Sequence, residues 1–555
     1  MGLVKTFEYE KDAFEKIRRY KYGKDWPVVY VLEGDKEAYI GETIHAYNRS
    51  QQHYQRMERR ALDFIHIIAD DDFNKSATLD IESLLIEYMA ADGKYKLQNG
   101  NGGLTNHSYF NRQKYQVKFE RIWEELRHKQ IVQKGIFELR NSDLFKYSPY
   151  KALNEEQLAT VENIMQCFKT QSESKHILQG EPGTGKTIVA IYLMKYMKEC
   201  EETKNKKIGL VVPMTSLRAT LKNVFKTVKD LNAGMVLGPA DVVKDQYDIL
   251  IVDEAHRLGR RVNQTNMKSF DDVNRALGLD IHEGDQLDWI MKSAHHIVLC
   301  YDKNQSIKPS DILPEKIAAL RAQEHRITSQ MRVMGGNDYI NYIHNILHQQ
   351  QDEELRFNKY DLLLFDEIHS MDQQLREKNK EYQLCRMVAG YAWEWKSKKN
   401  PDAYDIVIQG KGFRWNSSQK DWVNSARSSE EVGCIHTIQG YDLNYVGVIL
   451  GEEIRYEQGQ IVIDEKGYFD RNGKRTIRDP EILKVYILNI YKTLLTRGIK
   501  GTYLYVCDSG LREYFRKFIP TYGSGCHTAY DLTGLNLQVA ENNVPYGISD
   551  ENGER

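Results

Sequence analysis

The sequence lacks the features of a secreted or membrane-bound protein. Its seven cysteines are odd in number and include no Cys-x-x-Cys pair, which argues against a disulfide framework and against a zinc site. No stretch approaches about 18 uninterrupted apolar residues, and the first residues lack the apolar run of a signal peptide. These absences predict reduced thiols, no membrane span and a cytoplasmic protein.

A strong net charge, internal repeats and low-complexity linkers are missing as well. The net charge is −2, so a surface that binds nucleic acid must be a local patch. The 41% hydrophobic and 28% charged residues are typical of a soluble globular protein. At roughly 100–200 residues per domain, the 555 residues suggest three or four domains.

Short apolar strands alternate with helical stretches along most of the chain. The clearest strands are residues 28–32, 208–212, 249–252, 297–300, 446–450 and 502–506. This alternation predicts an α/β protein with parallel sheets built from β-α-β units. Residues 111–140 differ, because they form a highly charged helical stretch. We interpret them as a connector, either with a solvated face or with a surface that contacts nucleic acid.

Residues 180–187, Gly-Glu-Pro-Gly-Thr-Gly-Lys-Thr, match the phosphate-loop pattern in full. They follow an apolar strand and precede a helical stretch, as this motif requires. Glycines let backbone N–H groups surround phosphates, and the helix N-terminus adds a positive dipole end. Lys186 is predicted to reach the β and γ phosphates of ATP, and Thr187 to hold Mg²⁺. The predicted nucleotide-binding residues of the loop are Gly180, Gly183, Thr184, Gly185, Lys186 and Thr187.

A second motif lies at the end of the strand 248–252, where the chain reads Asp253-Glu254-Ala-His. An apolar strand that ends in adjacent acids suits a magnesium-dependent triphosphatase. Asp253 is predicted to bind Mg²⁺, and Glu254 to polarise the attacking water.

Further segments follow in the order found in superfamily 1 helicases. They are residues 153–157, 212–216, 302–305, 329–332, 436–440 and 491–498. The resemblance covers roughly residues 145–531. The segments 386–396 and 438–442 look like the Schlafen-type ATPases, the family once catalogued as domain of unknown function 2075. The interval from 212–216 to the second motif is short, and no large extra domain stands before 436–440. This leaves strand separation, translocation and a nucleotide-driven switch open.

The resemblance implies two RecA-like domains with ATP bound between them. It implies that Gln157 reads adenine, that Gln305 and Gly440 lie at the nucleotide, and that a single strand contacts residues 212–216. Arg332 and Arg497 would point at the γ-phosphate, where an arginine stabilises transition-state charge. Arg332 taken alone would be an ordinary surface residue of an ion pair.

Near the start of the chain, two short strands carry Tyr30 and Tyr39 on either side of a Gly-Asp turn. Arg49 follows, and His53 lies four residues later on the same helix face. With Tyr39-Ile-Gly intact, residues 26–103 resemble the GIY-YIG nucleases, although the first half of the name is altered to Val-Tyr-Val.

The resemblance implies a metal-binding glutamate on a later helix, where Glu82 fits the pattern better than Glu87, and a late asparagine at Asn99. Mg²⁺ or Mn²⁺ on Glu82 would polarise the scissile phosphate. Arg49 would neutralise developing charge. Tyr30 or Tyr39 would orient or deprotonate water, and deprotonation needs a depressed phenol pKa. His53 would assist as a base. Taken singly, each of these residues has an ordinary structural explanation.

The sequence therefore predicts a small mixed α/β GIY-YIG domain followed by two RecA-like P-loop domains with parallel sheets. The predicted boundaries are 1–110 for the nuclease, 111–144 for the connector, and 145–330 and 331–555 for the two RecA-like domains. The predicted function is an endonuclease coupled to an ATPase on single-stranded or branched DNA, in repair or in defence against foreign DNA. Two alternatives stay open: a nucleotide-driven switch whose N-terminal module only binds, and an RNA-directed nuclease.

Overall fold

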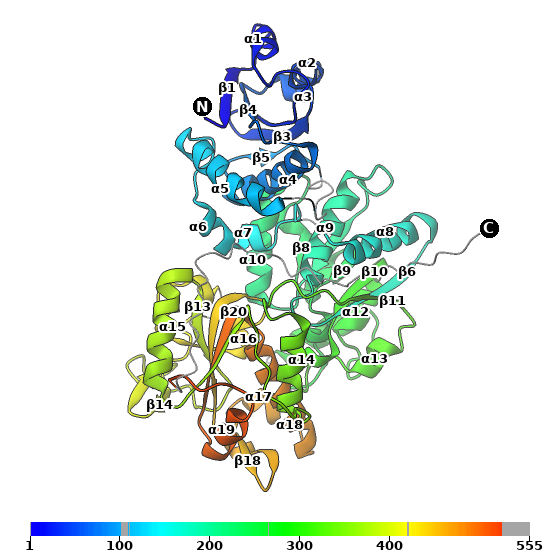
Figure 1. Cartoon of the computed structure of the whole chain (residues 1–555). Helices are drawn as coiled ribbons and strands as arrows, with labels where there is room; N and C mark the ends of the chain where they lie inside the picture. Colours follow the sequence, from blue (N-terminus) through cyan, green and yellow to red (C-terminus); the bar gives the residue numbers. More distant parts are fainter. Residues whose placement is uncertain are drawn as a thin grey trace, which may run out of the picture.

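Three main sheets follow one another along the chain (Figure 1). The computed structural model describes residues 2–100, 109, 111–151, 153–264, 266–418 and 421–523. The end of the predicted second RecA-like domain, including Cys526, lies outside the described residues. The other six cysteines are free thiols. In the part of the chain that the structure describes, no helix is long and apolar enough to cross a membrane.

The N-terminal sheet is mixed and has the strand order β1-β4-β2-β3-β5. Its strands are β1 (Val4–Glu8), β2 (Val28–Glu33), β3 (Glu37–Thr43), β4 (Phe64–Ile68) and β5 (Lys96–Leu97). Its helices are α1 (Ala13–Arg19), α2 (Ala46–Tyr54), α3 (Met57–Arg60) and α4 (Lys75–Asp92). Alternate residues of β2 enter two different cores: Val29 and Val31 pack beneath α4, and Tyr30 and Leu32 pack on the opposite face. The two faces of this sheet therefore pack in two different hydrophobic cores.

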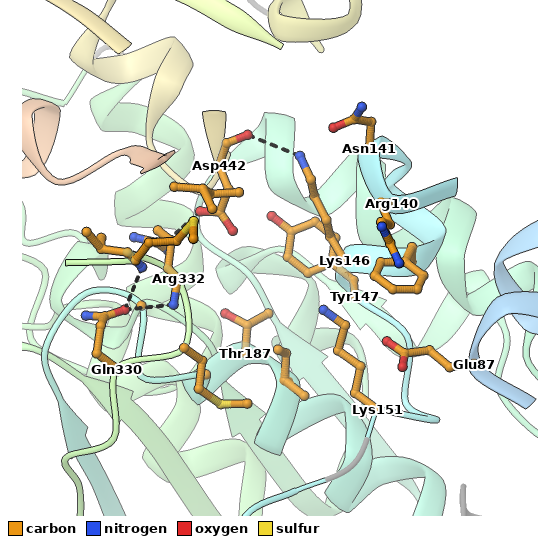
Figure 2. A pocket seen from close by; sticks show the side chains of 18 of the residues that line it. Glu87, Arg140, Asn141, Lys146, Tyr147, Lys151, Thr187, Gln330, Arg332 and Asp442 are labelled. Atoms are coloured by element: carbon orange, nitrogen blue, oxygen red, sulfur yellow. Dashed lines mark hydrogen bonds and ion pairs between the residues drawn. The ribbon is translucent and has the colours of Figure 1, made fainter. Parts of the chain in front are cut away.

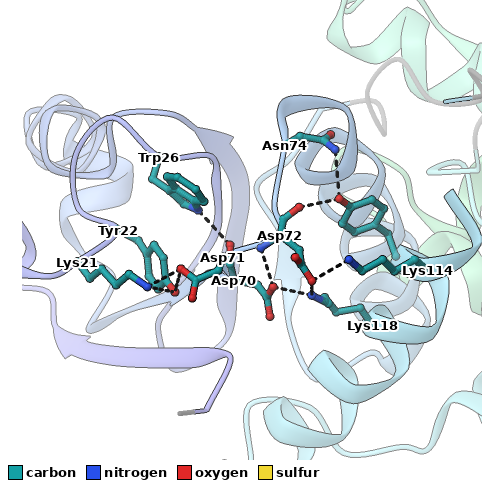
Figure 3. A network of polar contacts seen from close by, with 10 residues as sticks. Lys21, Tyr22, Trp26, Asp70, Asp71, Asp72, Asn74, Lys114 and Lys118 are labelled. Atoms are coloured by element: carbon teal, nitrogen blue, oxygen red, sulfur yellow. Dashed lines mark hydrogen bonds and ion pairs between the residues drawn. The ribbon is translucent and has the colours of Figure 1, made fainter. Parts of the chain in front are cut away.

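The predicted connector is packed against the N-terminal sheet. Its main helix, α5 (Arg112–His128), buries Phe119, Ile122 and Trp123. The expected solvated face is therefore only one side of α5, because apolar residues at helical spacing stand between the charged residues and form a buried stripe. Lys118 binds the carboxylates of Asp70 and Asp72, and these contacts hold the loop after β4 against α5 (Figure 3).

The first parallel sheet has the order β11-β6-β10-β9-β7-β8. Its strands are β6 (Ser174–Gly180), β7 (Ile208–Val211), β8 (Val236–Leu237), β9 (Tyr247–Val252), β10 (Ala294–Tyr301) and β11 (Gln323–Ile327). Its helices are α8 (Glu155–Thr170), α9 (Lys186–Glu199), α10 (Thr215–Thr227), α11 (Met267–Ala276), α12 (Gln286–Ser293) and α13 (Pro314–Ala318). The central strands contain buried apolar runs, residues 249–252 in β9 and 297–300 in β10, because helices cover both faces of a parallel sheet.

The second parallel sheet has the order β12-β20-β17-β13-β16. Its strands are β12 (Asp361–Phe365), β13 (Cys385–Ala389), β16 (Val432–Cys434), β17 (Leu443–Leu450) and β20 (Gly498–Val506). Its helices are α14 (Gly336–Leu347), α15 (Ile368–Tyr382), α16 (Ile435–Ile438), α17 (Arg471–Lys474), α18 (Pro480–Leu495) and α19 (Ser509–Arg516). Two hairpins are added to it: β14 (Ile406–Ile408) with β15 (Lys411–Phe413), and β18 (Ile454–Glu457) with β19 (Gln460–Ile463). The two parallel sheets confirm the predicted α/β class.

Two short helices, α6 (Ile136–Asn141) and α7 (Asp143–Lys146), join α5 to the first parallel sheet and also touch the second. Asn444 donates a 2.8 Å hydrogen bond to the side-chain oxygen of Asn141. Lys146 donates a 3.1 Å hydrogen bond to the carbonyl of Asp442. The connector thus reaches both lobes, as we call the two parallel-sheet units.

Candidate functional site

The loop between β6 and α9 turns at two glycines with left-handed backbone. Gly183 and Gly185 have φ values of 88° and 85°, which favour glycine. A Cβ atom at Gly183 would lie 2.1 Å from the side-chain oxygen of Gln330. Lys186 opens α9, and its ammonium donates a 2.5 Å hydrogen bond to the carbonyl of Gly180. A helix N-terminus, a glycine-rich turn and a lysine together form an anion-binding arrangement.

Two acids stand at the end of β9, next to this loop. The hydroxyl of Thr187 donates a 2.9 Å hydrogen bond to Asp253. Burial and the adjacent charge of Glu254 raise the pKa of Asp253. For Glu254, the effect of burial is outweighed by His256, 3.0 Å away, so the pKa of Glu254 lies below its usual value. Hydroxyl and carboxylate oxygens suit Mg²⁺, so Thr187 and Asp253 fit a magnesium site.

Two arginines from beyond the first sheet face the same loop. Arg332 forms an ion pair with Asp442. Arg497 is only 1% exposed, and it donates a 3.3 Å hydrogen bond to the carbonyl of Tyr441. Burial, with the nearby charge of Arg332, lowers the pKa of Arg497 to about 10. Gln305, which closes a short turn after β10, donates a 2.8 Å hydrogen bond to Asp302. Both arginines line the same cavity as Lys186 and Thr187.

A cavity of about 710 Å³ joins these groups (Figure 2). Among the predicted residues it is lined by Gly183, Gly185, Lys186, Thr187, Asp253, Glu254, Gln305, Arg332, Gly440 and Arg497. Its remaining wall includes Glu87, which the sequence offered as the second candidate metal ligand. It also includes charged and polar residues that the sequence did not single out: Arg140, Lys146, Tyr147, Lys151 and Lys500.

Gly180, Gln157 and Thr184 are predicted nucleotide-binding residues that do not line this cavity. Gln157 is fully buried and caps the start of α8. Its amide donates a 3.0 Å hydrogen bond to the carbonyl of Thr184 and contacts the sulfur of Met331. Its oxygen accepts a hydrogen bond from the backbone of Asn154. Thr184 is also buried, with its hydroxyl bound to the carbonyl of Glu181. Contact between Gln157 and adenine therefore stays a prediction that requires these bonds to rearrange.

In the N-terminal unit, the predicted residues from β2, β3 and α2 form one polar group. The hydroxyl of Tyr30 lies 2.7 Å from Nε2 of His53, and the rings of Tyr39 and His53 are 5.1 Å apart. A hydrogen bond to Tyr30 raises the pKa of Arg49. The sequence did not point to Arg59, whose guanidinium lies 3.5 Å over the Tyr39 ring and contacts His53. Four neighbouring elements thus contribute to one site.

The electrostatics of this group differ from one expectation. Burial raises the pKa of Tyr30 above its usual value, the opposite of what a phenol acting as a base needs. Burial and the charges of Arg59 and Arg49 lower the pKa of His53 to about 3, so the imidazole is neutral at physiological pH. Tyr30 is therefore suited to hydrogen bonding rather than to deprotonating water.

Glu82 of α4 lies near the same group. Its pKa is raised to about 7, mainly by burial and then by the charge of Glu42, whereas Lys75 and Arg49 oppose the rise. Glu42 itself is bound by Lys75. Two adjacent carboxylates could hold Mg²⁺, which commonly uses one or two carboxylates and water. Asn99 instead bridges the backbone N–H and carbonyl of Ile40, which is a structural role.

A phosphate loop, acids at the end of the neighbouring strand, and two parallel-sheet lobes define a P-loop nucleoside triphosphatase. The chain belongs to the Schlafen group 3 family, because the model of that family's DNA/RNA helicase domain matches residues 174–508. It therefore carries a helicase-like P-loop ATPase domain, which confirms the predicted Schlafen-type resemblance. The N-terminal unit lies outside the match, and its GIY-YIG resemblance stays a prediction.

Other relatives are more distant. An uncharacterized protein of Saccharomyces cerevisiae is 25% identical over 422 residues, covering 65% of this chain and 88% of the relative. An ORC1-type DNA replication protein of Pyrococcus furiosus is 24% identical over 184 residues, covering 30% of this chain and 43% of the relative. A Pif1 helicase structure from Bacteroides with ADP-AlF3 and ssDNA has a TM-score of 0.28 at 12% identity, covering 67% of this chain and 95% of that one. An arterivirus nonstructural protein 10 helicase with DNA has a TM-score of 0.29 at 13% identity, covering 66% of each chain. Structural similarity at these TM-scores does not indicate a shared function.

Proposed function

We propose that the chain is an ATP-hydrolysing motor on nucleic acid whose N-terminal unit is a metal-dependent endonuclease of the GIY-YIG type. The observation that carries the motor is one cavity whose lining includes Lys186 and Thr187 of the first lobe together with Arg332 and Arg497. Arginines that meet the γ-phosphate only when the lobes approach would link lobe closure to hydrolysis. This arrangement supports ATP as the bound nucleotide.

Each side chain at the motor site has a role in this proposal. Lys186 and the loop amides bind the phosphates. Thr187 and Asp253 hold Mg²⁺, which neutralises phosphate charge when bound. Glu254 orients the attacking water, and its lowered pKa keeps it an acceptor. Arg497 stabilises charge that develops on the transferred phosphoryl group.

A nucleic-acid strand would cross the lobes where α10 meets the segment 436–440. A Cβ atom at Gly440 would lie 3.3 Å from the end of Met214 and 3.4 Å from Leu217, so the two segments are adjacent. The family's description as a DNA/RNA helicase domain supports nucleic acid as the partner. We propose single-stranded or branched DNA, with RNA as the alternative, and a role in repair or in defence against foreign DNA.

For the nuclease, the supporting observation is the convergence of Tyr30, Tyr39, Arg49, His53 and Glu82. Glu82 holds Mg²⁺ or Mn²⁺, which lowers the pKa of bound water when present. Arg49 neutralises charge on the phosphate, and the tyrosines with His53 orient the water through hydrogen bonds.

A second function is an ATP-driven switch whose N-terminal unit binds nucleic acid without cutting it. Two observations favour it. Burial raises the pKa of Tyr30. In the described ranges, no cluster of three or more His, Cys, Asp or Glu side chains is arranged to hold a metal ion.

The experiment is a nicking assay with labelled duplex, branched and single-stranded DNA and with matched RNA. The full chain is incubated with Mg²⁺ or Mn²⁺, with and without ATP. The variants are Glu82→Ala, Arg49→Ala and Lys186→Ala, with the exposed Glu10→Ala as the matched control. We expect cutting that Glu82→Ala and Arg49→Ala abolish and Glu10→Ala retains. Lys186→Ala should lose ATP hydrolysis.

Three outcomes separate the proposals. Metal-independent cutting, or cutting retained by Glu82→Ala, contradicts the nuclease site. ATP hydrolysis stimulated by nucleic acid without any cutting selects the switch. Hydrolysis that survives Lys186→Ala rejects the motor site.

A further inference from the structure

Helix α4 of the N-terminal unit presents one face to the nucleotide cavity. Asp80, Ser83, Leu84 and Glu87 all line it. At about 100° per residue, these four positions fall within an arc of about 100° on a helix. Glu82 lies about 150° from the centre of that arc, near Arg49 and Glu42. The helix thus carries the predicted metal ligand on one side and a wall of the cavity on the other.

Glu87 is the acidic group of this wall that has no assigned partner. Among the described residues, no group hydrogen-bonds to its carboxylate. Burial raises the pKa of Glu87, and the positive charges of Lys151 and Arg140 lower it. Arg140 is already engaged by the hydroxyl of Tyr88, 2.7 Å away. A carboxylate that faces a polar cavity is therefore free to accept a hydrogen bond from a ligand.

The position of Glu87 relative to the phosphates identifies which part of a nucleotide it would meet. In the view of Figure 2, Glu87 and Lys151 lie on the opposite side of Thr187 from Arg332. Because Arg332 marks the γ-phosphate end in the proposed motor, the nucleoside extends in the opposite direction. Phosphate oxygens only accept hydrogen bonds and would repel a carboxylate, whereas ribose hydroxyls and base amino groups are donors.

Gln157, which is predicted to read the base, does not contact the cavity in this structure. Gln157 has both of its amide atoms bound inside the protein and does not line the cavity. We propose that Glu87 is a nucleotide-recognition residue, which accepts a hydrogen bond from the ribose 2′-hydroxyl or the base amino group of the nucleotide held at Lys186 and Thr187. This inference rests on the proposed motor function and adds the N-terminal unit to its binding site.

The test is isothermal titration calorimetry of the full chain with ADP, 2′-deoxy-ADP and inosine diphosphate, which lacks the amino group of adenine. The variants are Glu87→Gln and Glu87→Ala, with Glu162→Gln on the exposed side of α8 as the matched control. We expect Glu87→Ala to weaken ADP binding about tenfold or more, as for the loss of a hydrogen bond to a charged group. Glu162→Gln should stay within twofold of the wild type.

The three ligands distinguish recognition from a structural role. The wild type should bind either 2′-deoxy-ADP or inosine diphosphate more weakly than ADP, and Glu87→Ala should remove that difference. The proposal is overturned if Glu87→Ala weakens the binding of all three ligands equally or leaves ADP affinity unchanged. It is also overturned if the wild type binds the three ligands with equal affinity. Thermal unfolding without nucleotide shows whether a variant is folded, and the isosteric Glu87→Gln serves if the alanine variant is not. A wild type that binds no ADP would reject the motor proposal itself.

Discussion

Replacing Arg497 by methionine should stabilise the protein while removing hydrolysis. Burial and the charge of Arg332 lower the pKa of Arg497 from 12.5 to about 10. At 1.36 kcal/mol per pH unit, this corresponds to about 3 kcal/mol against the charged form in the folded protein. Arginine is charged in both the folded and the unfolded chain at neutral pH, so the folded protein bears this free-energy cost at neutral pH. The cost would decrease only above pH 10, where the folded-state guanidinium begins to lose its proton. Methionine fills similar space without a charge, and burying a charge without an ion-pair partner is costly, so removing that charge should be stabilising.

The assay compares nucleotide-free thermal unfolding with ATP hydrolysis. For a lobe of this size, each kcal/mol corresponds to about 2–4 °C, so Arg497→Met should raise the unfolding midpoint by several degrees. The turnover rate should fall about a thousandfold or more, as for other arginines that stabilise phosphoryl transfer. The exposed Arg471→Met serves as the control and should change neither quantity. A midpoint that falls by several degrees would show that Arg497 is mainly structural. Hydrolysis near the wild-type rate would refute its catalytic role.

Two further predictions concern Glu453 and Gly185. Tyr491 donates a hydrogen bond to Glu453, and burial raises the pKa of Glu453 from 4.5 to about 7. The stability that this carboxyl contributes is fully present below pH 4.5 and is lost as pH rises through 7, so Glu453→Gln should flatten the fall in unfolding midpoint between pH 5 and 8. An unchanged slope in thermal scans would contradict this. A Cβ atom at Gly185 would lie 2.7 Å from Nε2 of Gln157 and 3.2 Å from the sulfur of Met331, in left-handed backbone. Gly185→Ala should therefore weaken ADP binding at least tenfold in calorimetry and cost about 1–3 kcal/mol of stability; wild-type affinity would show that the loop can relax.

The two parallel sheets could be predicted because their signals are local. Five of the six predicted strands coincide with strands of these two sheets, since central strands buried on both faces contain apolar runs. The sixth, residues 28–32, coincides with β2 of the N-terminal sheet. The phosphate loop is contiguous in sequence, and its strand and helix context could be recognised around it. The connector was harder to predict, because the apolar residues of α5 stand between charges and only their helical spacing reveals a packed face.

The far wall of the cavity could not be predicted from sequence. Glu87, Lys151 and Lys500 come from distant parts of the chain, and no nearby motif indicates that they line a shared cavity. The sequence offered Glu82 and Glu87 as competing metal ligands, although helix geometry places them on different faces. Nor could it show that the amide of Gln157 is used inside the protein or that Tyr30 is buried, since both depend on neighbours brought together by folding.

The position of α4 gives the two proposed activities a physical link. Glu82 and Glu87 are five residues apart, which corresponds to a rise of about 7.5 Å along one rigid helix. A nucleotide that draws Glu87 toward the cavity would move Glu82 by a similar amount, and hydrolytic geometry is sensitive to displacements of about 1 Å. The connector adds a second restraint, because Asn141 contacts Asn444 of the second lobe. Lobe closure and nucleotide occupancy would therefore act on the same helix. On this reasoning, ATP should change the rate of cutting without any contact between the nucleotide and the scissile phosphate, and equal cutting with and without ATP would show that α4 does not transmit the change.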